Sequence, residues 1–218
     1  MGIVYQTTMK PTKLEILAPW LLDRPWYLGT GRPPRLSRTG GFRLDDPLGE
    51  VGIELMVATD ESGERPVSYH LPLTYRGAPL EGAEHALIGT SRHGVLGKRW
   101  VYDGTHDPVL VAQVLELLQG RAEPQARSQS NTPDPSVTSH FSGAAFPVAV
   151  RTTAVTDGPD GTELVVEPEA GERPLRVHIT RVLQAGQRTP GDEARGFVTA
   201  PWSLPDGTEP RGVFLQLR

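Results

Sequence analysis

The chain has 218 residues, among them 24 glycines, 21 prolines and no cysteine, and its formal net charge is −4. The absence of cysteine excludes a disulfide scaffold and a cysteine-ligated zinc site, and the many turn residues disfavour a long helical bundle. The acidic balance lacks the basic footprint of a protein that binds nucleic acid or an anionic membrane, so we expect neither as a partner.

The first nine residues have neither the basic start nor the apolar run of a secretory signal peptide. No apolar stretch in the sequence approaches the length of about 20 residues that spans a bilayer as a helix. We therefore expect a cytoplasmic protein.

Residues 12–21 predict the first helix. Thr12 is a good N-cap residue, and Glu15 three positions later completes the pattern of a capping box. The apolar residues at helical spacing, which we expect to be buried, are Leu14, Leu17 and Leu21. Pro19 lacks a backbone N–H, so we expect it to kink or end the helix.

Glycine-rich stretches follow this helix. Gly29 and Gly31 flank Thr30, Gly40 adjoins Gly41, and both stretches are typical of turns. Neither contains the GxGxxG or GxxxxGK[ST] pattern of a nucleotide-binding loop. We therefore predict turns here and no nucleotide site.

An antiparallel sheet and a second helix are predicted next. The expected strands are 51–59, 67–75 and 95–103, with a hairpin loop at 61–64 between the first two. The second helix occupies residues 107–120: Asp107 can cap it, Pro108 fits its first turn, and Gly120 can close its end.

Residues 121–142 are polar, rich in Pro, Ser and Thr, and have no apolar period, which is typical of a linker. Beyond them every predicted element is a strand, and we find no repeat of fixed period. These strands are expected at 148–156, 163–167, 175–183, 196–202 and 212–217.

The predicted fold class is α+β: mostly antiparallel β-sheets, with two main helices packed on the N-terminal sheet and a β-rich C-terminal unit. We predict three segments along the chain. They are an α+β module at 1–125, a polar linker at 126–145 and a small antiparallel β module at 146–218.

Aromatic residues gather around two short stretches of the first half. Sugars stack on aromatic rings while their hydroxyls contact charged side chains. The candidate ligand-binding residues are Trp26, Tyr27, Arg32, Trp100, Tyr102 and Asp103. Core packing is the alternative, because Trp100 and Tyr102 share one face of a predicted strand. The solvent exposure of the rings decides between the two.

Histidines and acids are concentrated between residues 85 and 107. They are His85, His93, Asp103, His106 and Asp107. They form no HExxH motif and no i, i+4 pair on a predicted helix, so we expect no metal site. The sequence contains no GxSxG motif either, and we predict no catalytic residue and no cofactor.

Three stretches of the first half resemble the maltokinase N-terminal cap domain. Residues 14–20 followed by 24–32 (RPWYLGTGR) are similar to the short helix and the Arg-Trp-Phe-x-Gly-Lys-Gly-Arg motif of that family. Residues 69–75 look like its Tyr-x-Leu-Pro-Leu strand, and residues 102–108 resemble its Asp-Ala/Gly-x-x-Asp-Pro helix entry. The resemblance covers roughly residues 10–125 and implies a cap-like fold.

A maltokinase continues into a kinase-like body that phosphorylates maltose with ATP, and this chain departs from that pattern. Residues 176–186 are faintly similar to the strand that carries the ATP-anchoring lysine, yet no lysine follows Lys98. The sequence also lacks the catalytic loop of phosphoryl transfer. The resemblance therefore implies a free-standing, cap-like protein of the actinobacterial type. Such proteins are sometimes labelled 1,4-alpha-glucan branching protein, although a branching-enzyme barrel needs about 250 residues.

These observations predict a non-catalytic accessory or interaction protein, linked through the resemblance to maltose, trehalose or α-glucan metabolism. The expected partner is another protein or a second copy of the chain, with an exposed sheet edge as a route to a homodimer. The alternative is a carbohydrate-binding module whose aromatic residues hold maltose or a maltodextrin. A degenerate kinase or other transferase is a third hypothesis.

Overall fold

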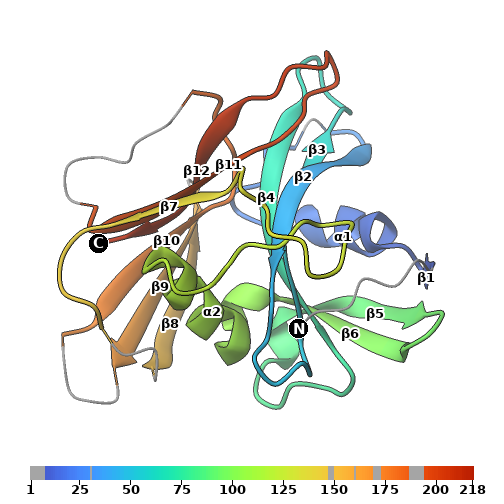
Figure 1. Cartoon of the computed structure of the whole chain (residues 1–218). Coiled ribbons are helices and arrows are strands. Elements are labelled where there is room, and N and C mark those ends of the chain that lie inside the picture. The colour runs from blue at the N-terminus through green and yellow to red at the C-terminus, as the bar shows by residue number, and fades with distance from the viewer. Residues whose placement is uncertain (1–7, 30, 147–149, 160, 169–172, 187–193) are drawn as a thin grey trace.

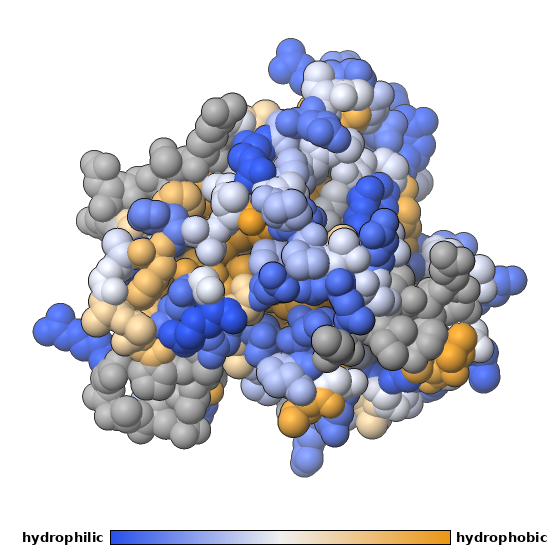
Figure 2. Space-filling view, in the orientation of Figure 1, coloured by the Kyte–Doolittle hydropathy of each residue, from blue (hydrophilic) through white to orange (hydrophobic). Residues whose placement is uncertain are grey.

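The computed structural model describes residues 8–29, 31–146, 150–159, 161–168, 173–186 and 194–218. Over these residues the fold consists of two six-stranded antiparallel sheets and two α-helices, which confirms the predicted α+β class (Figure 1). No helix among the described residues is both long and apolar enough to cross a membrane. Figure 2 shows mainly hydrophilic residues over the centre of one face, with apolar residues gathered on the side of the second sheet.

The first sheet, sheet A, has the strand order β1-β5-β6-β4-β3-β2. Its strands are β1 (Met9–Lys10), β2 (Leu36–Leu44), β3 (Gly52–Asp60), β4 (Val67–Arg76), β5 (Leu87–His93) and β6 (Gly97–Asp103). The predicted strands at 51–59, 67–75 and 95–103 correspond to β3, β4 and β6. The other three strands were not predicted.

The second sheet, sheet B, has the order β7-β11-β12-β10-β9-β8. Its strands are β7 (Thr138–Phe141), β8 (Val150–Gly158), β9 (Gly161–Pro168), β10 (Leu175–Thr180), β11 (Gly196–Pro201) and β12 (Arg211–Leu217). Counted from its own first strand, each sheet has the same order. The topology is therefore duplicated, and the matching strands β3 and β9 even share the pattern Gly-x-Glu-Leu-x-Val.

Helix α1 (Lys13–Leu21) covers the outer face of sheet A. The capping box predicted at Thr12 and Glu15 is confirmed, and Pro19 lies within the helix, which ends two residues later. Leu17 and Leu21 are buried, and Leu14 is partly buried, in a small core between α1 and sheet A. Figure 1 shows α1 on one side of strands β2–β4 and sheet B on the other.

Helix α2 (Pro108–Leu118) begins as predicted, with Asp107 as N-cap and Pro108 in the first turn. It packs on the N-terminal sheet, as predicted, and the second sheet covers it as well. It lies in the larger core between the two sheets and contacts β7, β8, β11 and β12. The reason is that α2 is apolar around most of its circumference and needs cover from both sheets.

Strand β3 is buried on both faces because it lies between these two cores. Ile53, Leu55 and Val57 point to the larger core, while Met56 and Ala58 point to the small core under α1. Alternation therefore places Glu54 on the α1 face, beside Met56. A carboxylate there is enclosed by protein and needs partners.

The two sheets are joined by backbone and side-chain bonds. The His70 N–H of β4 donates to the Arg181 carbonyl at 2.9 Å. The Arg181 guanidinium, which is fully buried, donates to Asp103 Oδ2 at 2.6 Å and to Thr162 Oγ1 at 2.7 Å, and it lies over the Trp26 ring. We call these residues the sheet junction.

The predicted linker at 126–145 is partly structured. Strand β7 falls inside the range 126–145, and Gln125 pairs with Arg43 of β2, so that stretch runs along sheet A before it enters sheet B. The boundaries 1–125 and 146–218 stay a prediction.

The turn predicted at Gly40-Gly41 is wrong: both glycines lie inside β2.

Candidate functional site

A charged pocket of about 340 Å³ lies on the α1 face of sheet A. It is formed where β2, β3 and β4 meet the start of α1, the β5–β6 hairpin and the loop after α2. Its lining consists of Met9, Lys13, Arg38, Arg43, Leu44, Asp46, Gly49, Glu50, Val51, Gly52, Ile53, Glu54, Tyr75, His93, Leu96, Arg99 and Arg127.

Glu54 is the centre of the pocket's polar network. Lys13 Nζ donates to Glu54 Oε2 at 2.5 Å, and Tyr75 Oη donates to the same oxygen at 2.7 Å. The Arg38 guanidinium donates to the other carboxylate oxygen. The Glu54 side chain is only 3% exposed, whereas Lys13 and Arg38 are 28% and 33% exposed. The carboxylate is therefore enclosed, and its two cationic partners still face solvent.

These contacts fix the charge of Glu54. Burial alone would raise its pKa, but the charges of Lys13 and Arg38 and the hydrogen bonds from Lys13 and Tyr75 lower the pKa to about 2. Burial, followed by the neighbouring Glu54 charge, raises the pKa of Tyr75 well above its usual value. Near neutral pH the site therefore holds a carboxylate and a neutral phenol beside Lys13 and Arg38.

A β-bulge places both arginines of β2 on this face. Arg43 pairs with Glu54 and Arg38 pairs with Ala58, and the register shifts between them at Thr39. Residues five positions apart in a regular strand point to opposite faces, so the extra residue brings Arg38 and Arg43 to the same face. Gly41 permits this geometry, because its φ is +105° and a Cβ there would lie 2.1 Å from the Leu55 carbonyl oxygen.

Arg43 ties the loop after α2 to the wall of the pocket. Its guanidinium donates to the carbonyl oxygens of Ala126 and Gln129, each at 3.1 Å. Burial lowers the pKa of Arg43, Asp45 and Glu54 oppose that shift, and the charge of Arg38 adds to it. The two guanidinium groups are thus close enough to repel each other.

Asp46 shapes the β2–β3 hairpin at the pocket's lower rim. Its carboxylate accepts hydrogen bonds from the backbone N–H groups of Leu48, Glu50 and Val51 at 2.9–3.0 Å. This carboxylate is buried and stabilises the turn. It is not aimed at a ligand.

The first half of the predicted aromatic set lies at the end of α1. Trp26 is fully buried and packs against Tyr69 in the small core. Tyr27 is half-buried and donates from its hydroxyl to Asp60 Oδ2 at 2.8 Å. Arg32 is exposed on the loop before β2.

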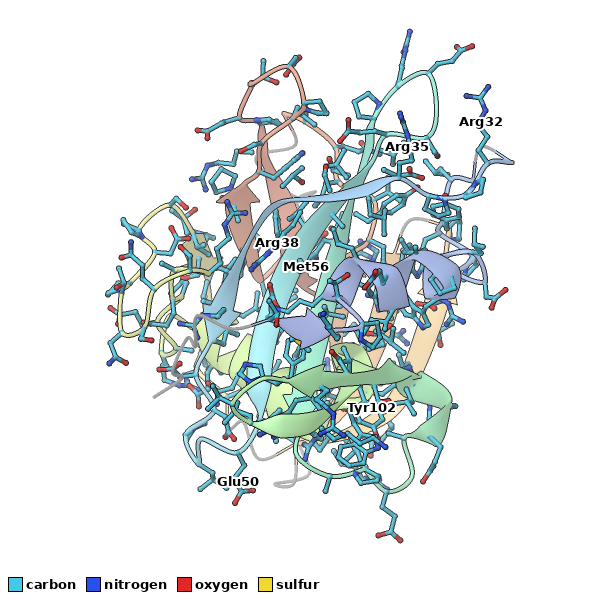
Figure 3. The ribbon with its side chains drawn as sticks, turned by 90° about the vertical axis from the view of Figure 1, so that its right-hand side faces the viewer. Arg32, Arg35, Arg38, Glu50, Met56 and Tyr102 are labelled. Carbon is cyan, nitrogen blue, oxygen red and sulfur yellow. The ribbon has the colours of Figure 1, made fainter. Side chains whose placement is uncertain are left out.

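The second half of the set lies elsewhere on the sheet. Tyr102 is buried and accepts a hydrogen bond from the Leu80 N–H, Trp100 is half-buried under the Lys98 ammonium, and Asp103 belongs to the sheet junction. Figure 3 shows Arg32 and Tyr102 far apart. The structure therefore does not bring the six residues to one surface, and the burial of Trp26 and Tyr102 favours core packing for those rings.

The histidines and acids predicted to form no metal site are also separated. His85 Nε2 and His106 Nδ1 lie 3.0 Å apart, but Asp103 binds Arg181 and Asp107 binds Arg76. His93 lies at the pocket instead. Within the described ranges no three His, Cys, Asp or Glu side chains are grouped as a metal site.

The sequence reasoning missed the pocket residues Lys13, Arg38 and Glu54. One signal was available: Glu54 is the charged residue in the stretch GIELMVA, in which every other residue is apolar or glycine. A carboxylate in such a strand is buried and must be paired. Its partners could not be read from the sequence, because the bulge in β2 and the position of α1 determine them.

Comparison with known protein families identifies one part of this chain. Residues 20–107 match the family described as Maltokinase N-terminal cap domain. The resemblance noted in the sequence is confirmed, and the chain contains a cap-like domain. The matched range includes β2, β3 and β4 and thus Arg38 and Glu54, while Lys13 precedes it. No curated protein matches the chain.

Proposed function

Starting from a chain with a maltokinase cap-like domain, we propose a non-catalytic accessory protein of maltose or α-glucan metabolism. Its function is to bind a small polar ligand in the charged pocket of sheet A. The family match supports the link to a maltose- or glucan-related module. The location of the binding site rests on the pocket and its polar network.

One observation supports binding rather than catalysis: every polar atom of Glu54 already has a charged or phenolic partner. A general acid or base works best with a pKa near the operating pH. The pKa of Glu54 is about 2 and that of Tyr75 is raised far above neutrality, so neither exchanges protons readily at pH 7. Fixed charges of this kind orient a ligand.

The pocket's size and donors limit the ligand class. About 340 Å³ is at the lower end of the volumes of small-molecule sites, which are roughly 300–1,000 Å³. Arg38 and Lys13 carry further N–H donors beyond those given to Glu54. The ligand is therefore a small molecule rich in hydrogen-bond acceptors.

Calorimetric titration with maltose, maltoheptaose and magnesium ATP tests this proposal. We expect saturable heat from at least one small polar ligand with no chemical turnover. We also expect Arg38→Ala to weaken that binding about tenfold or more, because hydrogen bonds from a charged group contribute about 1.5–3 kcal/mol. Trp100→Ala should leave the affinity unchanged.

Two results would contradict the proposal. Loss of binding in Trp100→Ala but not in Arg38→Ala would move the site to the predicted aromatic set. Product formation from magnesium ATP and maltose would make the chain an enzyme. A protein partner or homodimer is a further part of the accessory role, and sedimentation at increasing concentration tests the homodimer.

A further inference from the structure

The pocket has an excess of positive charge in an acidic protein. Its lining contains five Lys and Arg side chains against three carboxylates, whereas the whole chain has a formal net charge of −4. The cations come from four different elements: α1, β2, β6 and the loop after α2. Folding therefore concentrates positive charge at this site.

Two of the three carboxylates are already used inside the protein. Asp46 accepts three backbone hydrogen bonds in the β2–β3 turn, and Glu54 is bound by Lys13, Arg38 and Tyr75. Glu50 is exposed on the hairpin, and Figure 3 shows it well away from Arg38. An incoming anion would meet cations before it met a free carboxylate.

The cations repel one another across the pocket. Besides burial, the charge of Arg38 lowers the pKa of Arg43, although Asp45 and Glu54 oppose that shift. Burial, Arg99 and Lys13 together lower the pKa of His93 on the opposite wall. Glu54 is already bound by Lys13 and Arg38, so an anion in the pocket would relieve the repulsion that remains.

The Arg99 side chain provides an independent observation. Its guanidinium NH2 donates to the Leu96 carbonyl oxygen at 2.8 Å, which holds the side chain at the pocket. Its Nε is buried and has no hydrogen-bond partner among the residues that the structure describes. A buried donor without a partner costs free energy unless a ligand or water binds it.

We infer that the charged pocket binds a phosphate group, either as a phosphate monoester of a small sugar or as free phosphate. This inference rests on the proposed function and names the chemical class of its ligand. The formal excess of two positive charges in the lining matches the charge of about −1.5 to −2 that a phosphate monoester carries at neutral pH. Guanidinium and ammonium donors on several elements suit its three terminal oxygens.

The experiment is a calorimetric titration of the full chain with glucose, glucose 6-phosphate, inorganic phosphate and maltose. We expect saturable binding of glucose 6-phosphate or phosphate that weakens as salt rises, with no detectable binding of glucose. Arg38→Ala and Arg99→Ala should each weaken that binding about tenfold.

Arg151→Ala is the matched control. Arg151 lies on β8, which matches β2 in the duplicated topology, and it forms an exposed ion pair with Glu167. The Arg151→Ala variant removes the same charge at a residue outside the pocket lining and should leave the affinity unchanged. Thermal melting confirms that each variant is folded, and Arg99→Ala tests the site independently of Glu54.

The titrations separate the outcomes. Tighter binding of glucose 6-phosphate than of phosphate identifies a sugar phosphate, and equal binding identifies free phosphate. Binding of maltose without either phosphate compound overturns the inference and leaves the proposed function standing. No binding of any kind overturns both. An equal loss in Arg151→Ala and Arg38→Ala would assign the effect to overall charge and overturn the site.

Discussion

Glu54 of β3 and Glu163 of β9 occupy the same position of matching strands, within the shared pattern Gly-x-Glu-Leu-x-Val. Glu54 is 3% exposed and bound by Lys13, Arg38 and Tyr75. Glu163 is 33% exposed and pairs with His178 at 2.6 Å and with the Arg218 guanidinium at 3.8 Å. Similar local sequence and equal topology therefore produce an enclosed network in one sheet and a more exposed pair in the other.

The layer outside each sheet explains the difference. Helix α1 and the loop at Ala126 cover the outer face of sheet A, while β9 and β10 of sheet B alternate between buried and more exposed positions. Exposed ion pairs contribute little to stability, because water screens them and their side chains lose entropy. A covered carboxylate must keep its partners. Helix α1 and the loop at Ala126, rather than strand β3 itself, therefore create the charged pocket.

The largest expected effect tests whether the two sheets form one folding unit. Arg181→Met leaves Asp103 buried without its cation, and loss of one partner of a buried pair costs about 3–5 kcal/mol of unfolding free energy. Urea unfolding followed by tryptophan fluorescence and by circular dichroism should give one coincident, weakened transition. Two separate transitions, one for each sheet, would contradict a shared core. The double variant Arg181→Met/Asp103→Asn should recover part of the loss.

The second effect compares the two glutamates directly. Glu54→Gln leaves Lys13 and Arg38 without their counter-charge, and a pKa lowered from about 4.5 to about 2 corresponds to about 3 kcal/mol of stability. Glu163→Gln should cost less than Glu54→Gln, because one-third of the Glu163 side chain is exposed and water screens its contact with His178. Denaturant unfolding at neutral pH measures both variants. Equal losses of unfolding free energy in the two variants would refute the role of α1 and the loop at Ala126 in stabilising the Glu54 network.

Local signals in the sequence predicted much of this fold. Capping by Thr12 and Asp107 is decided within a few residues, and both helices begin where the sequence predicts. Strand β2 was missed because its two glycines are typical of turns, yet Gly41 adopts its positive φ inside the strand, close to a β-bulge. Bulges depend on the partner strand, which local composition does not reveal.

Such local signals could not predict the candidate site. Arg38 reaches Glu54 only because the bulge changes which face it points to, and Lys13 reaches it only because α1 packs there. The aromatic rings illustrate the same limit, since Trp26 is buried by contacts with β4 that no spacing predicts. Long-range packing determines which face of a sheet a side chain points to and which element covers that face.

The third effect is the pH dependence of the unfolding free energy, compared between the histidines of the matching strands β4 and β10. Burial and the Arg181 charge lower the pKa of His70 to about 3, against the opposing effects of Thr180 and Asp103. The folded state thus binds fewer protons than the unfolded state below the ordinary histidine pKa of about 6.5. Stability is complete above that value and falls as the pH decreases toward 3, by about 2 kcal/mol between about pH 6.5 and 5.

His70→Asn keeps a donor near the Thr180 carbonyl oxygen, which His70 Nδ1 contacts at 3.0 Å, and cannot titrate. It should flatten the stability profile above about pH 5 in urea unfolding measured at several pH values. The comparison variant His178→Asn changes the histidine of the matching strand β10, whose side chain is 15% exposed, and should alter the slope less than His70→Asn does. A slope above about pH 5 that persists in His70→Asn would assign the acid sensitivity to a group other than His70 and other than Glu54, whose window lies lower, from about pH 4.5 to 2.

The smallest effect on stability accompanies a clear effect on binding. Arg38→Ala on β2 should cost less than about 1 kcal/mol of unfolding free energy, because its guanidinium is one-third exposed and Glu54 keeps Lys13 and Tyr75. Arg151→Ala on the matching strand β8 should have a similarly small cost. The two variants should then differ only in ligand affinity, measured by calorimetry with glucose 6-phosphate. If Arg38→Ala unfolds the protein while Arg151→Ala does not, the pocket's cations serve the fold, and the contrast between the sheets is one of stability alone.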